Sequence, residues 1–516
     1  MSKLRALLLH YCTTERTHPA SNSKRQCMAP DALVPLAAAT ALTYLAIHSG
    51  RSLGTAPLPL LPALAALDIR DSNASLLAQP HNMPALTHLA LEQMATWLPV
   101  HLTVDFSSFT TLQSFSWPDS IDAVSLPLAH LSHLVLGDSG LSVADVGGAP
   151  LPSALRLRSL QLCLPPKAGA RRCSIAACTG LTALSFWPTR RREDTRALLA
   201  LTQLASLTIH GAEDIEPGEL FPTVGRLSAL RELVLFLSNA AFGHHPLQAI
   251  DLAQLPRGIT RLEVGHRHST AVTAFSTSAD HLHMRTPPLY GLPLARLALL
   301  HPVWRTAPAA LAPCAATLRS LELMLAQTDI APLAACTGLT ELQLFLRTDM
   351  PDAPVPLAAY TTLARMPALR RLLLGRFAPL NAAQAAALVP LSALESLVVL
   401  AMSADCPEPP TRYSGSECLQ PLVSLTSLTE LHLQCVWPIQ VSDICALAAL
   451  QDLCSFELQR SAVDAAACRA IAQLTTVRHV GLSSPSCGRP NSSTLAELAP
   501  MTQLLSLDLG GEVVPS

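Results

Sequence analysis

Apolar residues recur along this chain in one six-residue pattern, apolar-x-x-apolar-x-apolar, between Leu42 and Leu509. The pattern occurs nineteen times, and the span from 42 to 504 divided among eighteen steps gives a mean spacing of about 26 residues. Self-similarity at such a period indicates an array of stacked supersecondary units. The first positions of the units are Leu42, Leu64, Leu86, Leu112, Leu131, Leu157, Leu181, Leu204, Leu230, Ile259, Leu294, Leu318, Leu339, Leu369, Leu394, Leu428, Leu453, Val477 and Leu504.

The fourth and sixth positions of each unit alternate with polar residues, which predicts a short strand with one buried face. A second apolar segment precedes most of these strands, for example Leu198–Leu204, and its spacing predicts a short helix. One such unit cannot bury its own apolar face, so neighbouring units must stack and share a core. We therefore expect strands along one side of the array and helices or irregular segments along the other.

Two distant segments show how closely the units match. Residues 176–186 and 334–344 are identical at eight of eleven positions. With its period, this pattern resembles the leucine-rich-repeat family over about residues 36–510, in the style of the Ala-rich repeat proteins of green algae. The resemblance implies an α/β solenoid, a horseshoe of about nineteen units with short parallel strands on the concave face and helices or irregular segments on the convex face.

One position departs from the family pattern. Leucine-rich repeats carry Asn or Cys three residues after the last strand leucine, where it satisfies loop backbone groups. The first positions of this kind here are Gly50, Ser72, Met94, Ser120, Ser139 and Pro165. We therefore expect the turns to satisfy their backbone groups in another way.

The spacing of the units also predicts the domain organisation. Residues 1–35 precede the first unit and are expected to be a disordered tail or a partial cap. Residues 36–516 are expected to form the solenoid, with longer loops near 265–293 and 401–424 where the spacing stretches.

Composition excludes several classes of function. Half of the residues are hydrophobic, only 14% are charged, and the formal net charge is −2, so the chain lacks the basic footprint of a nucleic-acid-binding protein. The uncharged stretch 32–50 contains polar residues and a repeat unit, so we expect no membrane span. The fourteen cysteines form no C-x-x-C pair, which favours reduced core residues. Cys178 and Cys336 lie at equivalent repeat positions, and we expect both to be buried.

Motifs that carry chemistry are absent from the sequence. It has no G-x-G-x-x-G, no P-loop, no H-E-x-x-H and no EF-hand loop. Gly137–Gly140 resembles a protease nucleophile segment but falls where a repeat turn belongs. Seven histidines between His244 and His301 lack close cysteine partners, so we interpret them as surface-loop residues. We predict no enzyme, no cofactor and no metal site, with an unrecognised site in one of the two long loops as the alternative.

A protein partner is the ligand that the residue types favour. The residue after each sixth position is unusually apolar or aromatic from the seventh unit on, and arginines and acids border this column. Aromatic, Met and Arg enrichment is typical of protein interfaces. The alternative is that the column packs against the edge of the sheet. The predicted partner-binding residues are Trp187, Phe236, Leu300, Met324, Phe345, Arg296, Arg319, Arg370, Glu322 and Glu341.

These observations predict a non-enzymatic scaffold that binds a protein through its concave face. The alternative is a subunit of a larger assembly, such as a cytoskeletal or axonemal complex or a ubiquitin-ligase substrate adaptor. The sequence predicts neither nucleic-acid nor membrane partners, and it leaves the oligomeric state open. We expect a cytoplasmic protein, with the cytoskeleton or the ciliary axoneme as specific sites and an organelle transit peptide as the alternative.

Overall fold

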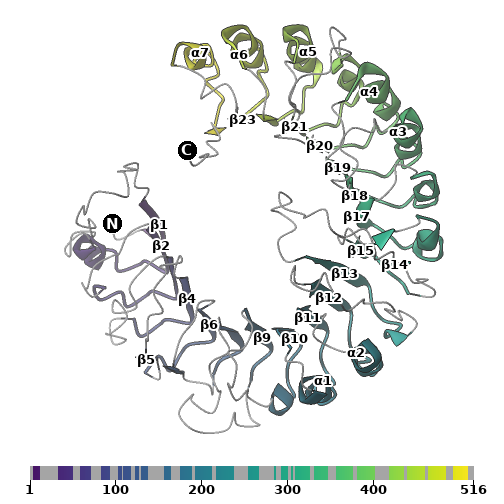
Figure 1. The fold of residues 1–516 in the computed structure, drawn as a ribbon. Helices are drawn as coiled ribbons and strands as arrows, with labels where there is room; N and C mark the ends of the chain where they lie inside the picture. The colour runs from purple at the N-terminus through teal and green to yellow at the C-terminus, as the bar shows by residue number, and fades with distance from the viewer. Residues whose placement is uncertain are drawn as a thin grey trace, which may run out of the picture. The chain divides into compact units, whose positions relative to one another are not determined.

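The computed structural model describes the chain in segments that cover most of the repeat cores (Figure 1). The chain divides into two compact units: unit 1 comprises residues 1–238 and 254–258, and unit 2 comprises residues 239–253 and 259–516. The described residues are 4–11, 33–49, 58–70, 83–92, 103–106, 108–117, 123–126, 130–136, 156–163, 175–188, 192–211, 217–237, 254–266, 284–285, 292–299, 304–305, 308–325, 330–346, 356–375, 380–400, 418–434, 439–459, 463–483 and 492–508.

Each repeat buries the three apolar positions that define it. In the repeat that starts at Leu339, the side chains of Leu339, Leu342 and Leu344 are fully buried, whereas Glu341 and Gln343 between them are part-exposed. Leu339 lies in the turn before the strand, and the strand itself begins two residues later. This burial confirms the alternation predicted from the sequence, because successive side chains of a strand point to opposite faces.

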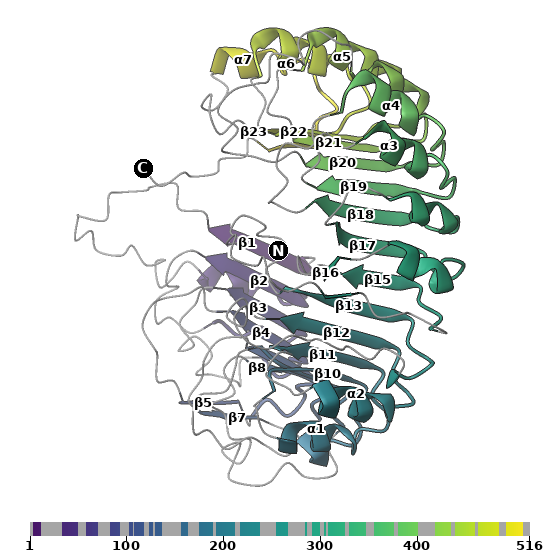
Figure 2. The same cartoon turned by 45° about the vertical axis from the view of Figure 1, so that its right-hand side comes forward.

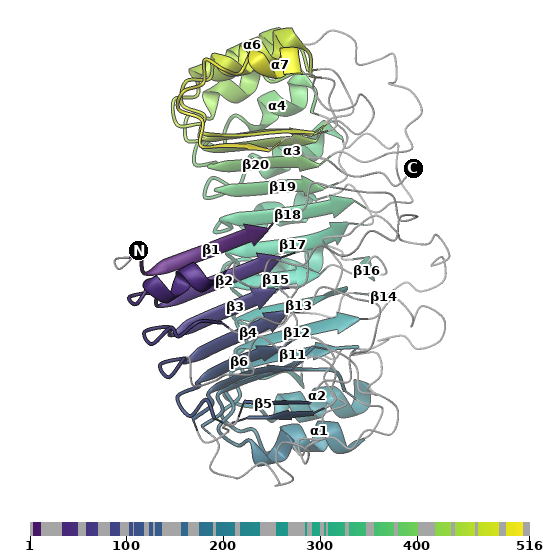
Figure 3. The same cartoon turned by 90° about the vertical axis from the view of Figure 1, so that its left-hand side faces the viewer.

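Unit 1 contains a ladder of parallel strands in which each strand pairs with that of the next repeat (Figure 3). The register joins equivalent repeat positions, as in Leu184↔Leu207. The strands follow in the order β1 (Ala6–Tyr11), β2 (Tyr44–Ser49), β3 (Ala66–Arg70), β4 (His88–Glu92), β6 (Ser114–Trp117), β8 (His133–Leu136), β9 (Ser159–Leu162), β10 (Ala183–Phe186), β11 (Ser206–His210) and β12 (Glu232–Leu237).

Unit 2 contains a second ladder built in the same way (Figure 2). Its strands are β13 (Arg261–His266), β15 (Arg296–Leu299), β17 (Ser320–Leu325), β18 (Glu341–Leu346), β19 (Arg371–Gly375), β20 (Ser396–Leu400), β21 (Glu430–Gln434), β22 (Ser455–Gln459), β23 (His479–Ser483) and β24 (Ser506–Asp508). Leu507 of β24 holds a core position but is 40% exposed, because no strand follows it among the described residues.

Helices cover the face of the strands opposite the part-exposed positions (Figure 1). In unit 1 they are η1 (Val34–Ala38), η4 (Ile175–Ala177), α1 (Arg192–Leu198) and α2 (Pro217–Gly225). In unit 2 they are η8 (Pro308–Cys314), η9 (Ala331–Ala335), α3 (Leu357–Leu363), α4 (Ala382–Leu388), η11 (Gln420–Ser424), α5 (Val441–Ala446), η12 (Leu447–Ala449), α6 (Ala465–Ala472) and α7 (Ser492–Ala496). We call the face of each sheet that the helices do not cover its inner face.

Local sequence explains where two of these helices begin. At α4, the Asn381 side chain accepts a hydrogen bond from the Gln384 amide, and the Gln384 side chain accepts one from the Asn381 amide. This capping box satisfies two backbone donors that the first turn would otherwise leave unpaired. At α6, the Asp464 carboxylate accepts a hydrogen bond from the Ala467 amide at 2.7 Å. The short helices on this side of the repeats agree with the sequence prediction.

The sequence did not predict three strand pairings. β1 lies within the predicted tail 1–35 and pairs with β2 in parallel, from Ala6↔Tyr44 onward. β5 (Thr103–Asp105) pairs with β7 (Ala123–Ser125), and β14 (Met284–Arg285) pairs with β16 (Trp304–Arg305). The two small sheets consist of segments too short to show a hydrophobic period, which is why sequence patterns cannot find them.

A ladder of hydroxyl groups supports the turns before the strands. The Thr340 hydroxyl donates to the carbonyl oxygen of Arg319, the equivalent residue one repeat earlier, at 2.9 Å. The same carbonyl accepts the backbone amides of Thr340 and Glu341. Equivalent hydroxyl bonds are made by Thr43, Thr87, Ser132, Thr182 and Thr429. The individual positions after the strands at which the sequence lacks the family's asparagine, the first being Gly50 and the last named being Pro165, lie outside the described residues.

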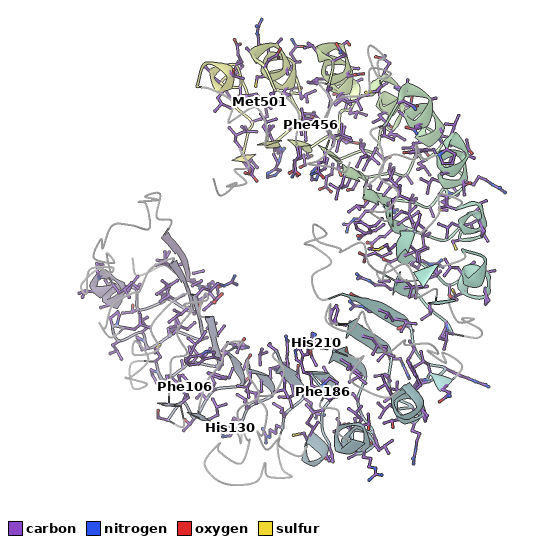
Figure 4. The ribbon with its side chains drawn as sticks, viewed as in Figure 1. Phe106, His130, Phe186, His210, Phe456 and Met501 are labelled. Atoms are coloured by element: carbon purple, nitrogen blue, oxygen red, sulfur yellow. The ribbon has the colours of Figure 1, made fainter. Side chains whose placement is uncertain are left out.

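The core of each repeat is mostly leucine, with larger side chains at intervals. Phe106, Phe186 and Phe456 are fully buried, and Figure 4 shows them on the helix side of the strands. In unit 1, Phe106 contacts the rings of Phe115 and Trp117, with centroids 5.1 Å and 6.3 Å away. These contacts fill the core of a region where the described residues include few helices.

Cys178 and Cys336 are buried and free, as their repeat positions predict. Burial raises the pKa of the Cys178 thiol to about 11 and also raises the pKa of Cys336. At neutral pH the reactive thiolate of Cys178 is therefore about a hundredfold scarcer than that of an ordinary thiol.

We expect thiol labelling of the native protein, resolved by residue with mass spectrometry, to leave Cys178 and Cys336 almost unmodified. Cys445 and Cys454 are exposed and serve as internal controls that should react fully. Equal labelling of the four cysteines in native protein would show that the register of the repeats is wrong.

Candidate binding face

The inner face of unit 2 carries the third, fifth and seventh residues of each repeat in three straight rows. The fifth-position row includes Glu322 on β17 to Glu457 on β22, and its members are Cα partners across each strand pair. The seventh-position row includes Met324 to Gln459 in the same register. Because the strands are parallel and in register, side chains of distant repeats lie side by side.

Four apolar residues lie on three adjacent strands at the centre of this face. Leu373 on β19 and Val398 on β20 are neighbours in the fifth-position row, and Phe345 on β18 and Leu400 on β20 belong to the seventh-position row. All four are part-exposed. The ring of Phe345 lies against Gly375, where a Cβ would overlap it, so glycine on β19 makes room for the ring. We call these four residues the apolar patch.

Charged and polar groups border the apolar patch. Arg371 pairs with Glu341 at 3.6 Å, and Arg370 pairs with Glu395. In the same third-position row, Glu430 accepts a hydrogen bond from the Ser396 hydroxyl at 2.8 Å. These groups give the apolar patch a polar border along the edge where the strands begin.

A histidine and a glutamate share contacts on β21 and β22. Nδ1 of His432 lies 3.2 Å from Oε2 of Glu457, and Oε1 of the same carboxylate accepts a hydrogen bond from the side-chain amide of Gln459. Burial lowers the pKa of His432 from its ordinary value, and the charge of Glu457 partly opposes that effect. The imidazole is therefore mainly neutral at neutral pH.

Glu322 differs from the other acids of this face. Burial, followed by the nearby charge of Glu263, raises the pKa of its carboxyl group, and Arg296 opposes this effect. Glu263 itself is paired with Arg261 at 3.1 Å. Among the described residues, Glu322 has neither a hydrogen bond nor an ion pair from its side chain.

The aromatic residues predicted for the partner-binding column in unit 1 stack on one another. The ring centroids of Trp187 and His210 are 5.3 Å apart, and those of His210 and Phe236 are 5.1 Å apart. Trp187 also donates to the carbonyl oxygen of Cys163 at 2.8 Å. Figure 4 shows His210 nearer the inner face than Phe186. These contacts tie three neighbouring strands together, as the packing alternative predicted, and a binding role for Trp187 and Phe236 stays a prediction.

Three of the predicted partner-binding residues, Leu300, Met324 and Phe345, share the seventh position of successive repeats and were expected to form one exposed strip, but the described residues do not show such a strip. Met324 is buried with 5% exposed, Phe345 is part-exposed, and Leu300 lies outside the described residues. The expectation of an exposed Met324 was wrong because the sequence does not show how far the ends of neighbouring strands cover one another.

The three predicted arginines occupy different environments. Arg319 donates to the backbone carbonyl oxygens of Leu318 and Gly338, both at 3.2 Å, so its guanidinium group supports two turns. Arg370 is paired with Glu395, whereas Arg296 on β15 is exposed. Of the predicted acids, Glu341 is paired with Arg371 and Glu322 is the acid without a partner described above.

Sequence reasoning missed Leu373 and Val398. Each lies inside a continuous apolar run, 372–374 and 397–400, which conceals the alternation of inward and outward side chains. An apolar residue at the fifth position of two successive repeats is the signal that could have found them, because that position faces away from the core.

The described residues contain no group of three His, Cys, Asp or Glu side chains that could hold a metal ion. The Gly137–Gly140 segment lies outside the described residues, as do the predicted surface histidines except for the backbone of His266. Most of the two long loops, 265–293 and 401–424, also lies outside them. None of the helices in the described part of the chain is long and apolar enough to cross a membrane.

No family model matches the sequence, and no curated protein matches it. Solved structures with a similar arrangement include an internalin from Listeria monocytogenes, at 17% identity over 72% of this chain and 86% of that one, with a TM-score of 0.35. A leucine-rich-repeat protein from Leptospira interrogans is 14% identical over 92% of this chain and 98% of that one, with a TM-score of 0.32.

A third similar structure is the leucine-rich-repeat ectodomain of a plant membrane receptor kinase from Arabidopsis thaliana, solved in complex with Casparian strip integrity factor 2. It is 14% identical over 92% of this chain and 65% of that one, with a TM-score of 0.32. The repeat pattern and the parallel ladders of this chain define a leucine-rich-repeat solenoid. The resemblance to algal repeat proteins rests on sequence style alone.

Proposed function

We propose that this chain is a non-enzymatic scaffold that binds a protein partner through the inner face of unit 2, centred on the apolar patch. The observation that carries the proposal is the patch itself: Phe345, Leu373, Val398 and Leu400 lie part-exposed on three adjacent strands. The repeat core is already filled by the first, fourth and sixth positions, so the stability of the fold does not require apolar residues at the fifth.

The surroundings of the patch support a protein partner. Interfaces between proteins combine a buried apolar centre with a polar rim that excludes water. Here the polar border consists of the Glu341–Arg371 and Arg370–Glu395 pairs and Glu430, all on the edge of the patch where the strands begin. A rigid ladder of strands also holds the contact residues in fixed positions, which lowers the entropic cost of binding.

The more specific roles, as a subunit of an assembly or as a ligase adaptor, are secondary proposals. A subunit of a cytoskeletal or axonemal assembly, or a ligase adaptor, would use the same face, and no contact in the described part of the chain favours one of them. A cytoplasmic location also stays a prediction.

The test compares two matched double variants. Leu373→Ser with Val398→Ser removes the centre of the patch, whereas Leu357→Ser with Val441→Ser removes one exposed leucine and one exposed valine from helices α3 and α5 on the other side. Burying two aliphatic side chains contributes about 3 kcal/mol or more to binding, so the patch variant should bind its partner about a hundredfold more weakly.

The partner is isolated by affinity capture on the wild-type chain and identified by mass spectrometry, and both variants are then compared with it in the same assay. Thermal unfolding of both variants should match that of the wild type. A patch variant that is folded and captures the same partner as well as the control variant does would contradict the proposed face.

A further inference from the structure

The fifth-position row of the inner face has a charge pattern that restricts the kind of partner it fits. The row continues in register from Glu263 and Ala298 before β17 to Gly481 and Asp508 after β22, and the part around the apolar patch carries the pattern. In this part, the two aliphatic residues of the patch lie at the centre, one neutral polar or histidine side chain follows on each side, and the nearest acid on each side comes next. Its six residues, in register from β17 to β22, are Glu322, Gln343, Leu373, Val398, His432 and Glu457.

In the described part of the chain, neither Glu322 nor Glu457 forms an ion pair with an arginine or lysine, although the charge of Arg296 acts on Glu322. Glu322 has no hydrogen bond or ion pair from its side chain in the described part of the chain. Glu457 contacts His432, which is mainly neutral at neutral pH, and the uncharged amide of Gln459. Other acids of this unit differ, since Glu263 and Glu341 each pair with an arginine.

An unpaired carboxylate in a desolvated position destabilises the free protein. Glu322 is partly in this situation, because its side chain is half-buried and contacts no hydrogen-bond donor among the described residues, while the charge of Arg296 offsets part of the cost. A cationic group of a ligand would remove that penalty on binding. Guanidinium and ammonium groups are the cations that a protein segment provides, and their contacts with carboxylates are stronger where water is excluded.

The distance between the two acids sets the length of the segment. Five spacings of about 4.8 Å separate β17 from β22, or about 24 Å. An extended chain rises about 3.3 Å per residue and covers this distance in about seven residues. A chain that crosses the strands would place its middle residues over Leu373 and Val398.

We propose that the row binds an extended peptide segment of a partner protein, with two Arg or Lys side chains about seven residues apart and an apolar pair between them. The inference rests on the proposed function and specifies its ligand. The arginine or lysine side chains pair with Glu322 and Glu457, and the apolar pair covers Leu373 and Val398. Phosphate backbones and acidic segments are repelled by the same row.

The probe is a synthetic peptide about eight residues long, with Arg at both ends, Leu-Val at its centre and Ser elsewhere. Fluorescence anisotropy measures its binding to the full chain. We expect saturable binding that weakens as salt rises, because the terminal contacts are ionic. Each of Glu322→Gln and Glu457→Gln should weaken binding about tenfold or more, as expected for loss of a charged hydrogen-bonded pair.

Two controls separate a ligand-binding role from a structural one. Glu497→Gln removes an acid that pairs with Arg469 away from the inner face, and it should leave peptide binding unchanged. Glu322→Gln should unfold at the same temperature as the wild type or higher, because it removes a desolvated charge. If Glu322 were needed for the fold, the Glu322→Gln variant would unfold at a lower temperature than the wild type.

Replacing both Arg residues of the peptide with Ser should weaken binding as strongly as the glutamate variants do. Absence of binding up to millimolar peptide overturns the proposed ligand. So does equal binding by the Glu322→Gln and Glu457→Gln variants. If binding of the captured partner requires Leu373 and Val398 but not Glu322 and Glu457, the proposed function stands and this inference fails. If binding of the partner requires none of these four residues, both fail.

Discussion

Leu342→Ala should lower the free energy of unfolding by about 2–5 kcal/mol, the range observed when a buried leucine is truncated in a packed core. Leu342 is fully buried on β18, and its partners across the strand pairs, Leu321 and Leu372, are equally buried. Truncation leaves a cavity lined by leucines that the neighbouring strands fix in place, so little relaxation can fill it.

The adjacent residue is the matched control for this prediction. Gln343 lies on the inner face and is part-exposed, so Gln343→Ala should change the free energy of unfolding by less than about 0.5 kcal/mol. Denaturant unfolding followed by circular dichroism measures both variants. Equal destabilisation by the two changes would mean that β18 does not alternate between core and inner face.

Asp443→Ala should be the second strongly destabilising change, by about 1–3 kcal/mol. Asp443 lies in the first turn of α5 and is 1% exposed. Its carboxylate accepts the backbone amide of Leu419 at 2.9 Å and lies 3.5 Å from the Cys418 thiol. Without the carboxylate, the buried amide of Leu419 loses its acceptor, and an unsatisfied buried donor keeps the full cost of its desolvation.

Asp443→Asn retains an acceptor oxygen at the same place, so it should recover at least half of the stability that Asp443→Ala loses. Asp452→Ala, at an exposed aspartate of the following turn, is the control and should change stability by less than about 0.5 kcal/mol. If Asp443→Ala is as mild as Asp452→Ala, the hydrogen bond to Leu419 does not contribute to stability.

The repeat core was predictable because its signal is periodic and redundant. Each unit repeats the same three buried positions, so an error in one unit is corrected by its neighbours. The first position is buried in every unit from Leu42 to Val477, and only Leu504, in the last unit, is part-exposed. The hydroxyl ladder at Thr340 and its equivalents supports the turns before the strands. The turns after the strands, where the sequence lacks the family's asparagine, lie outside the described residues, so their different support stays a prediction.

The binding face was harder to predict because inner-face residues follow no period. The sequence drew attention to the seventh position, where Trp187 and Phe236 stand out, yet these rings stack along the edge of the sheet with His210. Two further part-exposed apolar residues lie at the fifth position of β19 and β20, beside Phe345 and Leu400 at the seventh. Leu373 and Val398 are indistinguishable from core residues until the register of the strands is known. The hydrogen-bond partners of polar side chains are also not evident from the sequence. Arg319 was predicted to border the binding face, but its guanidinium group donates to carbonyl oxygens of turns.

The affinity of the isolated partner for the Leu373→Ser, Val398→Ser chain tests the central claim most directly. It is measured beside the wild-type chain and the Leu357→Ser, Val441→Ser chain in one titration series. We predict a dissociation constant about a hundredfold higher for the patch variant, with wild-type affinity for the control and matching unfolding temperatures for all three. Equal affinities of the three chains would show that the partner binds elsewhere on the protein.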